Sequence, residues 1–150
     1  SFLLSDILAS ILYKQLKQAD QISKMRSLVT NAYKQLFDPY VESGKLSIPI
    51  PPDGVKINNH AFFVIFNSEK IQQLFLTLLK EKNINAYIGY MPLHSSPMGK
   101  TFGYKPEDLP ITESIASRIV RLPFYTDLHS NENLNYCIEG MQDVLKSIYS

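Results

Sequence analysis

Apolar residues recur with a helical period through the first forty residues of the chain. Ser5 and Asp6 suit a helix N-terminus, because a serine hydroxyl caps free backbone N–H groups and an acid complements the helix dipole. No proline or glycine follows before Pro39 and Gly44. The pattern therefore predicts one long helix, or two helices with a bend, that ends by Gly44. The residues on its apolar face are spaced three or four apart, at Leu8, Leu12, Leu16, Ala19, Ile22, Met25, Val29, Ala32 and Leu36.

A helix of this length extends across a small domain, so we expect something outside the domain to cover its far end. The segment 48–54 that follows is rich in proline and ends in Asp53 and Gly54. Proline disfavours helix at its own position and at the residue before it. We therefore expect an extended segment and a turn there.

Three short apolar segments predict strands, at residues 60–66, 86–90 and 119–122. The first is apolar on both faces, which is typical of a central strand. Between and after them, apolar positions at helical spacing predict a helix from Ser68, a short helix near Thr112 and a last helix after Ser130. The apolar faces of the two longer helices comprise Ile71, Leu74, Phe75, Leu78 and Leu79, and then Leu134, Cys137, Ile138, Met141, Val144, Leu145 and Ile148.

Asn83 is a plausible left-handed stop for the helix that begins at Ser68, since asparagine sometimes replaces glycine there. Pro123 ends the third predicted strand, at residues 119–122. Three strands with covering helices, behind a long leading helix, predict an α+β domain of two layers.

Composition and net charge restrict the classes of function that this chain can have. The chain has 150 residues, 45% of them hydrophobic and 19% charged, which fits one globular domain. Its 15 basic and 14 acidic residues give a net charge of +1, which argues against a nucleic-acid partner. A loose basic cluster, comprising Lys14, Lys17, Lys24 and Arg26, is interpreted as a solvated helix face.

Sulfur and histidine content argue against disulfides and metal sites. The single cysteine, Cys137, occupies an apolar position of the last helix and is interpreted as a small core residue. His60, His94 and His129 lie too far apart for a zinc site of paired spacing; we interpret His60 as structural and His129 as exposed. No segment has the length of a membrane span, and the first residues do not resemble a signal peptide. We therefore expect a cytoplasmic protein.

The run from Gly89 to Gly103 is the best candidate for chemistry. It follows a predicted strand and places two prolines and three glycines around His94, without the period of a helix or strand. Ordered loops of this kind often carry binding or catalytic groups. The residues alone leave two roles open for His94: it stabilises the loop, or it contacts a ligand. Lys100 and Lys105 flank the loop and are interpreted as solvated lysines.

The neighbouring hydroxyl of Ser95 raises the alternative of a hydrolase. Residues adjacent in sequence rarely face each other productively, and a serine hydrolase also needs an orienting group and an oxyanion hole. The chain contains no Gly-x-Ser-x-Gly elbow, no Gly-x-Gly-x-x-Gly and no Walker loop. Glu107 and Asp108 are adjacent in a turn, which points their carboxylates apart.

Residues 92–103 read Pro-Leu-His-Ser-Ser-Pro-x-Gly-x-x-Phe-Gly. This wording closely resembles the C-terminal part of the DegT/DnrJ-type sugar aminotransferases that depend on pyridoxal phosphate, and among them the transaminases that form dTDP-4-amino-4,6-dideoxygalactose. Three further segments, residues 1–9, 59–63 and 121–125, resemble this family in the same order along the chain. The resemblance thus covers nearly the whole sequence.

The resemblance implies the C-terminal small domain of a fold-type-I aminotransferase, with a short, mainly antiparallel sheet covered by helices. Residues 1–43 would be its connecting helix and residues 44–150 an α/β sandwich. In the family, a preceding large domain supplies the lysine that forms the Schiff base and the aspartate that holds the pyridine nitrogen. Neither has a matching motif in this chain. The resemblance therefore implies that the catalytic large domain is absent, that no catalytic residue lies in this chain, and that the chain by itself is inactive.

The implied reaction transfers an amino group from glutamate to C4 of a dTDP-4-keto-6-deoxyhexose, for nucleotide-sugar and cell-surface polysaccharide biosynthesis. The implied cofactor is pyridoxal 5'-phosphate, bound by the full-length protein rather than by this chain, and the expected assembly is a homodimer. By resemblance, His94 and Tyr90 line the sugar-nucleotide end of the pocket, and Ser95 hydrogen-bonds there. Ser1 aligns with a position that reaches the cofactor phosphate of the partner subunit.

The sequence departs from the family pattern at three positions. Phe2 stands where the family has tyrosine, Leu3 where many relatives have arginine, and Gly89 where relatives commonly have histidine. A stand-alone binding or regulatory module with a transaminase-derived fold remains the main alternative. A large-domain lysine encoded upstream would favour the transaminase, whereas an independent start just before Ser1 would favour the module.

Overall fold

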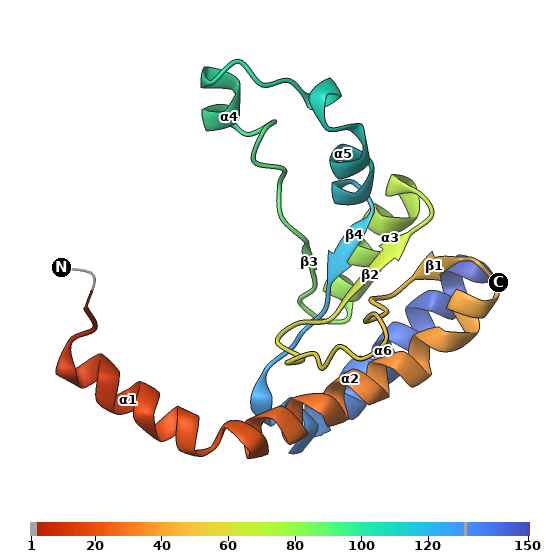
Figure 1. Ribbon diagram of the computed structural model, residues 1–150. Helices are drawn as coiled ribbons and strands as arrows, with labels where there is room; N and C mark the ends of the chain where they lie inside the picture. The colour runs from red at the N-terminus through yellow and green to blue at the C-terminus, as the bar shows by residue number, and fades with distance from the viewer. Residues whose placement is uncertain (1–2, 131) are drawn as a thin grey trace.

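Two consecutive helices lead into a small sheet in the structure, a computed structural model that describes residues 3–130 and 132–150. They are α1 (Asp6–Lys17) and α2 (Ala19–Glu42), and the chain bends between them at Gln18 (Figure 1). Of the two sequence-based alternatives, the leading segment is therefore two helices. The Ser5 hydroxyl caps α1, as predicted, by accepting a hydrogen bond from the Leu8 backbone N–H.

Helix α2 ends in a left-handed turn at Gly44, which has φ +68°. The Gly44 N–H donates to the Val41 carbonyl at 2.9 Å, and the Lys45 N–H donates to the Tyr40 carbonyl at 2.9 Å. A glycine takes a positive φ without the steric cost that a side chain would bring. This turn reverses the chain and brings it back along α2.

The chain then forms a four-stranded antiparallel sheet in the order β1-β2-β4-β3. The strands are β1 (Leu46–Ser47), β2 (Phe63–Phe66), β3 (Tyr87–Ile88) and β4 (Ile119–Arg121). The β2 strand is internal, which confirms the expectation of a central strand at residues 60–66, although it begins three residues later. Strand β1 was not predicted, because two residues before a proline-rich segment carry no period.

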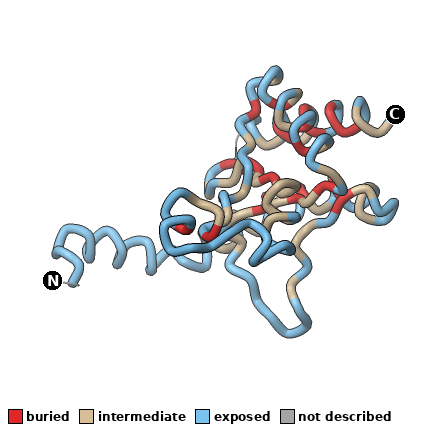
Figure 2. Tube along the Cα trace, turned by 90° about the horizontal axis from the view of Figure 1, so that it is seen from above, coloured by how far each residue is buried: buried red, intermediate tan, exposed pale blue. Residues whose placement is uncertain are grey.

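Helices α2, α3 (Glu69–Glu81) and α6 (Glu132–Tyr149) pack on one face of the sheet. The Phe66 and Phe75 rings lie 4.8 Å apart between β2 and α3, and Asn83 ends α3 with φ 56°, as predicted. Figure 2 shows the buried residues concentrated where these elements meet. The core they form comprises Val29, Tyr33, Phe37, Leu46, Phe62, Val64, Phe66, Phe75, Leu79, Ile84, Val120, Leu122, Leu128, Cys137, Met141, Val144 and Leu145.

Side chains alternate across the two faces of the sheet. In β2, Val64 and Phe66 are buried under the helices, whereas Phe63 and Ile65 point to the opposite face and remain half-buried. Arg121 lies on that opposite face as well, because its Cα is paired with Phe63 of β2 and with Tyr87 of β3. One face of the sheet therefore belongs to the core, and the other carries the residues of the candidate site.

Residues 89–116 leave the sheet after β3 and return to it at β4; we call this segment the arm. It contains α4 (Pro97–Thr101), the 3-10 helix η1 (Pro106–Asp108) and α5 (Pro110–Ala116). Figure 1 shows the arm projecting from the body of the molecule. The short helix expected near Thr112 is α5, whereas α4, in the predicted irregular loop, was missed. A second 3-10 helix, η2 (Thr126–Ser130), links β4 to α6.

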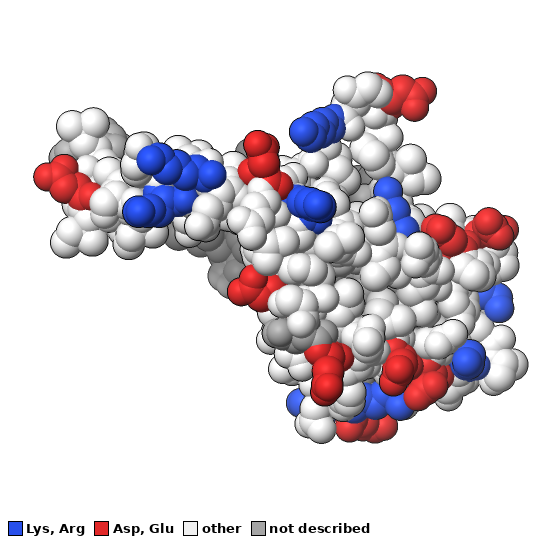
Figure 3. Space-filling model, turned by 90° about the horizontal axis from the view of Figure 1, so that it is seen from below, with Lys and Arg blue, Asp and Glu red and all other residues white. Residues whose placement is uncertain are grey.

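Helix α1 also projects from the body, and none of its residues is buried. Figure 3 shows Lys and Arg side chains gathered on this projection, whose last turn carries Lys14 and Lys17. The Lys17 ammonium lies 4.5 Å from the centre of the Tyr13 ring. Lys14, Lys17 and Lys24 are exposed, which supports the interpretation of a solvated helix face, whereas Arg26 is half-buried and its Nε atom is buried, so the interpretation does not hold for Arg26. Across residues 3–130 and 132–150, every helix is too short or too polar to cross a membrane.

Candidate functional site

His94 points into the arm rather than toward solvent. It is 8% exposed, and only His94 and Gly99 are buried within residues 89–116. The turn is fixed by Ser96, whose hydroxyl accepts from the Gly99 N–H at 3.0 Å and donates to the Leu93 carbonyl at 2.6 Å. A Cβ at residue 99 would overlap the carbonyl oxygens of Leu93 and His94. Glycine is therefore required where α4 packs against the turn that carries His94.

The His94 imidazole faces a carboxylate from the other side of the arm. Its Nε2 atom lies 3.1 Å from Oε1 of Glu113, which belongs to α5. Both atoms are buried, and within the described residues neither makes a hydrogen bond of good geometry. Protonation of the imidazole would turn this contact into an ion pair. The two residues thus tie the turn before α4 to α5.

An apolar hollow of about 690 Å³ lies beside this contact. Its walls are formed by the arm, and His94 is one of its few polar lining residues; the apolar ones include Leu93, Met98, Phe102, Tyr104 and Leu109. Four of these five side chains are more than half exposed. The arm therefore presents apolar surface around a histidine that is held by an acid.

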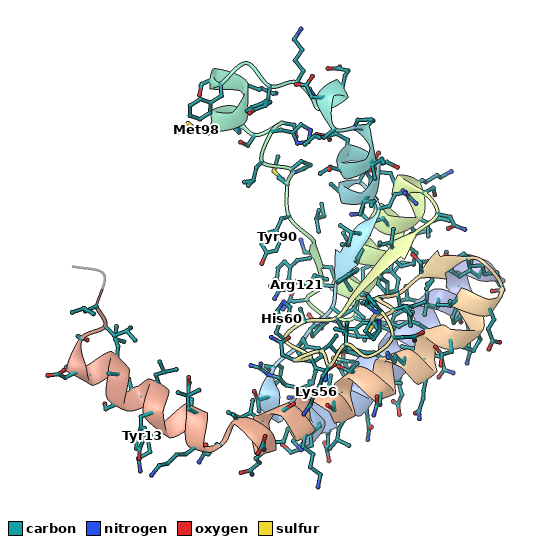
Figure 4. The ribbon with its side chains drawn as sticks, in the orientation of Figure 1. Tyr13, Lys56, His60, Tyr90, Met98 and Arg121 are labelled. Carbon is teal, nitrogen blue, oxygen red and sulfur yellow. The ribbon has the colours of Figure 1, made fainter. Side chains whose placement is uncertain are left out.

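Tyr90 and Arg121 form a second polar feature, at the edge of the sheet. Tyr90 follows β3 and is 76% exposed, and its hydroxyl accepts a hydrogen bond from Nη1 of Arg121 at 2.6 Å. The guanidinium carbon lies 5.7 Å from the centre of the Tyr90 ring. Figure 4 shows the two side chains adjacent to each other, on the side that faces the opening between α1 and the arm.

The structure separates the residues that the sequence grouped together. His94 contacts Glu113, Tyr90 contacts Arg121, and the hydroxyl of Ser95 donates to the Pro92 carbonyl at 3.3 Å. The hydrolase alternative has no support here, because His94 and Ser95 are directed to different partners. Ser1, predicted from the resemblance to reach the cofactor phosphate, lies outside the described residues.

Sequence reasoning missed Glu113 and Arg121 as site residues. Glu113 follows Pro110 in the first turn of α5, so an acid near a proline-started helix was a usable but weak signal. Arg121 was noted only as part of a motif. Its role depends on strand pairing, which places it beside Tyr87 and within reach of Tyr90.

The other two histidines each contact an oxygen atom of a neighbouring residue. His60 is exposed, with Nδ1 2.9 Å from Oδ1 of Asn58. His129 is half-buried rather than exposed as expected, and its Nδ1 lies 3.1 Å from the Thr126 carbonyl oxygen. In the described part of the chain no three metal-ligating side chains gather.

Gly89, where the resemblance predicts a histidine, has its space filled in this chain. A Cβ there would lie 2.7 Å from a methyl group of Ile119 on the neighbouring strand β4. A histidine at this position would have to displace that side chain. Apolar packing by Ile119 therefore occupies the space beside residue 89.

Comparison with known proteins decides the family. The model of the DegT/DnrJ/EryC1/StrS aminotransferase family matches residues 1–142. The chain belongs to this family. It is 30% identical over 134 residues to the dTDP-4-amino-4,6-dideoxy-D-glucose transaminase of Escherichia coli, a match that covers 84% of this chain and 34% of the relative.

A second relative is the dTDP-3-amino-3,4,6-trideoxy-alpha-D-glucose transaminase of Micromonospora megalomicea subsp. nigra. It is 26% identical over 147 residues, which cover 97% of this chain and 38% of the relative. The chain thus spans between a third and two fifths of the length of these curated relatives.

Among solved structures, the putative sugar aminotransferase Spr1654 of Streptococcus pneumoniae, in its PMP form, superposes with a TM-score of 0.84 at 21% identity. The match covers 97% of this chain and 36% of that protein. At this identity the likeness shows the fold, and it confirms the predicted α+β class: part of a fold-type-I aminotransferase with a small antiparallel sheet.

Proposed function

We propose that this chain is the C-terminal part of a transaminase that moves an amino group from glutamate to C4 of a dTDP-4-keto-6-deoxyhexose. The observation that carries the proposal is the family match over residues 1–142. Two relatives named as dTDP-amino-sugar transaminases support the substrate class. The product would be a dTDP-4-amino-4,6-dideoxyhexose such as the galactose isomer, for cell-surface polysaccharide such as lipopolysaccharide. The enzyme would act in the cytoplasm as a homodimer.

In this proposal, residues 1–43 connect a large domain to a small domain formed by residues 44–150. The exposed apolar side chains of α1 support this division. Ile7 is 74% exposed and Leu16 is 63% exposed, although both belong to a capped and regular helix. Apolar surface of this kind is normally covered in a complete protein. The large domain would cover it.

The described residues do not form a complete binding site for pyridoxal phosphate, the cofactor implied by the family. The cofactor's aldehyde needs a lysine with a lowered pKa, which proteins obtain by desolvation or by a neighbouring cation. Among residues 3–130 and 132–150, every lysine and every aspartate is exposed or only half-buried. The reactive lysine and the partner of the pyridine nitrogen would therefore come from outside this chain, which by itself would be inactive.

The contribution of the chain would be to bind and orient the sugar nucleotide. Tyr90 is the candidate for direct contact, because its ring is exposed and its hydroxyl is already oriented. His94 lines the hollow of the arm and is held by Glu113. Ser95 is held by the Pro92 carbonyl. His94 and Ser95 would then shape the wall of the substrate pocket that the arm supplies.

A stand-alone binding or regulatory module is the second candidate. The observation that favours it is the same lack of a buried lysine or aspartate in the described residues. Such a module would keep the transaminase-derived fold and bind a related ligand without chemistry. It requires that no large domain precede Ser1.

The two candidates are separated by isolating the protein from its source and trapping any Schiff base with borohydride. We expect a pyridoxyl-lysine on a residue that precedes Ser1, and formation of 2-oxoglutarate when glutamate and a dTDP-4-keto-6-deoxyhexose are supplied. The 150-residue chain should give no adduct. A stoichiometric adduct on a lysine within residues 1–150 would contradict the proposal that the reactive lysine lies outside this chain. A natural protein that lacks both the adduct and the activity would favour the module.

A further inference from the structure

Arg121 is a cation without an acidic partner among residues 3–130 and 132–150. Its Nη1 donates to the Tyr90 hydroxyl at 2.6 Å. Among the described residues, the acidic side chains within 4 Å of a basic nitrogen are Asp143, beside Lys82, and Glu113, beside the His94 imidazole, and neither lies beside Arg121. A guanidinium carries five N–H donors. Most of the donors of Arg121 are therefore not used within the described part of the chain.

Arg118 provides a contrast only three residues earlier in the chain. Its Nε, Nη1 and Nη2 atoms donate to the Ser114 carbonyl, the Phe66 carbonyl and the Ser114 hydroxyl, at 2.8, 3.0 and 3.1 Å. This is the pattern of a structural arginine, in which each nitrogen has a protein partner. Arg121 has the same chemistry but is held by one nitrogen only.

Arg121 is also held in one orientation. Its Cα is paired with Phe63 on one side and Tyr87 on the other, and the Tyr90 ring lies 5.7 Å from the guanidinium carbon. A stacked and hydrogen-bonded guanidinium loses less side-chain freedom when it binds a ligand than a mobile one does. The side chain is thus oriented before any ligand arrives.

A second cation, Lys56, lies on the same side of the molecule as Arg121 (Figure 4). Figure 4 places Lys56, His60, Arg121 and Tyr90 along the inner side of the molecule, which faces the opening between α1 and the arm. Lys56 and His60 are exposed. The Tyr90 hydroxyl accepts from Arg121, which leaves its own O–H free to donate. The His60 Nδ1 atom already contacts Asn58, so the N–H and O–H donors that suit a negatively charged ligand are those of Lys56, Arg121 and Tyr90.

We propose that Arg121, oriented by Tyr90, is an oxyanion-binding site that holds a phosphate or a carboxylate group through its unused N–H donors. A guanidinium binds either group with two parallel hydrogen bonds. If the proposed function is correct, the oxyanion belongs to the diphosphate of the sugar nucleotide or to the carboxylate of glutamate. The geometry of the site depends on neither assignment.

The test is a titration of the isotope-labelled 150-residue chain, followed by NMR signals of the Arg121 side chain and the Tyr90 amide at constant ionic strength. One arm uses thymidine 5'-diphosphate and the other uses L-glutamate. Binding in the first arm assigns a phosphate, and binding in the second assigns a carboxylate. We expect Arg121→Gln to weaken binding at least about tenfold, since hydrogen bonds to charged groups contribute about 1.5–3 kcal/mol.

Two further variants control for charge and for folding. Tyr90→Phe keeps the ring and should weaken binding about threefold, as expected for loss of one modest hydrogen bond. Lys70→Gln removes an exposed lysine of α3 and should leave the affinity unchanged. Arg121→Lys keeps the positive charge, so it is measured as well in case Arg121→Gln fails to bind because it is misfolded. Absence of binding in both arms, or equal affinity of the wild type and Arg121→Gln, would overturn the site.

The natural protein distinguishes this inference from the proposed function. If it is a transaminase, Arg121→Lys should raise the KM of one substrate more than it lowers kcat. An active transaminase with unchanged KM values would overturn the site and leave the function standing. Binding of an oxyanion at Arg121 in a protein without transaminase activity would overturn the proposed function and leave the site standing.

Discussion

Replacement of Gly99 by alanine is the sharpest test of how the arm is held. The new Cβ would overlap two backbone carbonyl oxygens, those of Leu93 and His94. Backbone atoms of a turn cannot rotate away as a side chain can. The arm must therefore open at the turn or α4 must move outward, and either change removes the constraint that points His94 inward.

The magnitude follows from two opposing terms. Overpacking a close contact typically costs about 1–3 kcal/mol, whereas alanine in place of glycine gains at most about 1 kcal/mol from helix propensity. Because both contacts are to backbone atoms, the cost lies in the upper part of this range, about 2–3 kcal/mol. The net loss is then about 1–2 kcal/mol, which corresponds to a rise in the local opening constant of about five- to thirtyfold. Because the rest of the arm is exposed or half-buried, we expect this loss within the arm rather than in the core.

Amide hydrogen exchange resolves the two regions. The Phe102 and Gly103 amides, which donate to the Gly99 and Lys100 carbonyls, should exchange faster in Gly99→Ala by the same factor. The Leu122 amide, which donates to the Phe62 carbonyl in the core, should exchange at the wild-type rate.

Gly89→Ala is the matched control for this experiment. Its Cβ would meet a methyl group of the Ile119 side chain rather than backbone, and a rotamer adjustment costs about 1 kcal/mol. This variant should leave the Phe102 and Gly103 amides unchanged. Wild-type exchange at these two amides in Gly99→Ala would refute the reasoning, because it would mean that residue 99 does not approach the turn closely.

Two predictions concern buried side chains. The Tyr33 hydroxyl donates to the Pro123 carbonyl at 2.7 Å, and burial, with smaller effects of Cys137 and Tyr125, raises the pKa of Tyr33. Since the folded state keeps this proton longer, the stability it contributes is present below the ordinary pKa of about 10 and is lost as the pH rises. Tyr33→Phe should cost about 1–2 kcal/mol at neutral pH and flatten the alkaline loss in urea unfolding curves; parallel curves for the two proteins would contradict this. Burial also raises the pKa of the Cys137 thiol, so a disulfide reagent should modify the folded chain at least about a hundredfold more slowly than the urea-unfolded chain, and equal rates would show that the thiol is accessible.

The helices were predictable because their signals are local. Ser68 and Asn83 mark the two ends of α3 through side-chain capping and a left-handed residue. In α6, the apolar spacing alone identified the buried face. Such features need no knowledge of the rest of the fold, since each depends on residues within one or two turns.

The remaining features depend on contacts between distant segments. Strand β1 has two residues, and α4 has five, so neither is long enough to show a period. His94 was predicted to line a substrate pocket, and its neighbours in sequence do not indicate that Glu113, on another helix, lies beside it. Whether Tyr90, His94 and Ser95 meet a substrate stays a prediction.

Helix α1 has a thermodynamic consequence for the chain in solution. It has 12 residues, buries none of them and contacts α2. An isolated helix of this length is marginal in water, because the cost of its first turn is not repaid by tertiary contacts. The helix content of residues 6–17 should therefore be partial while solvent surrounds the apolar side of α1. It should rise when another protein surface covers that side and excludes water from it.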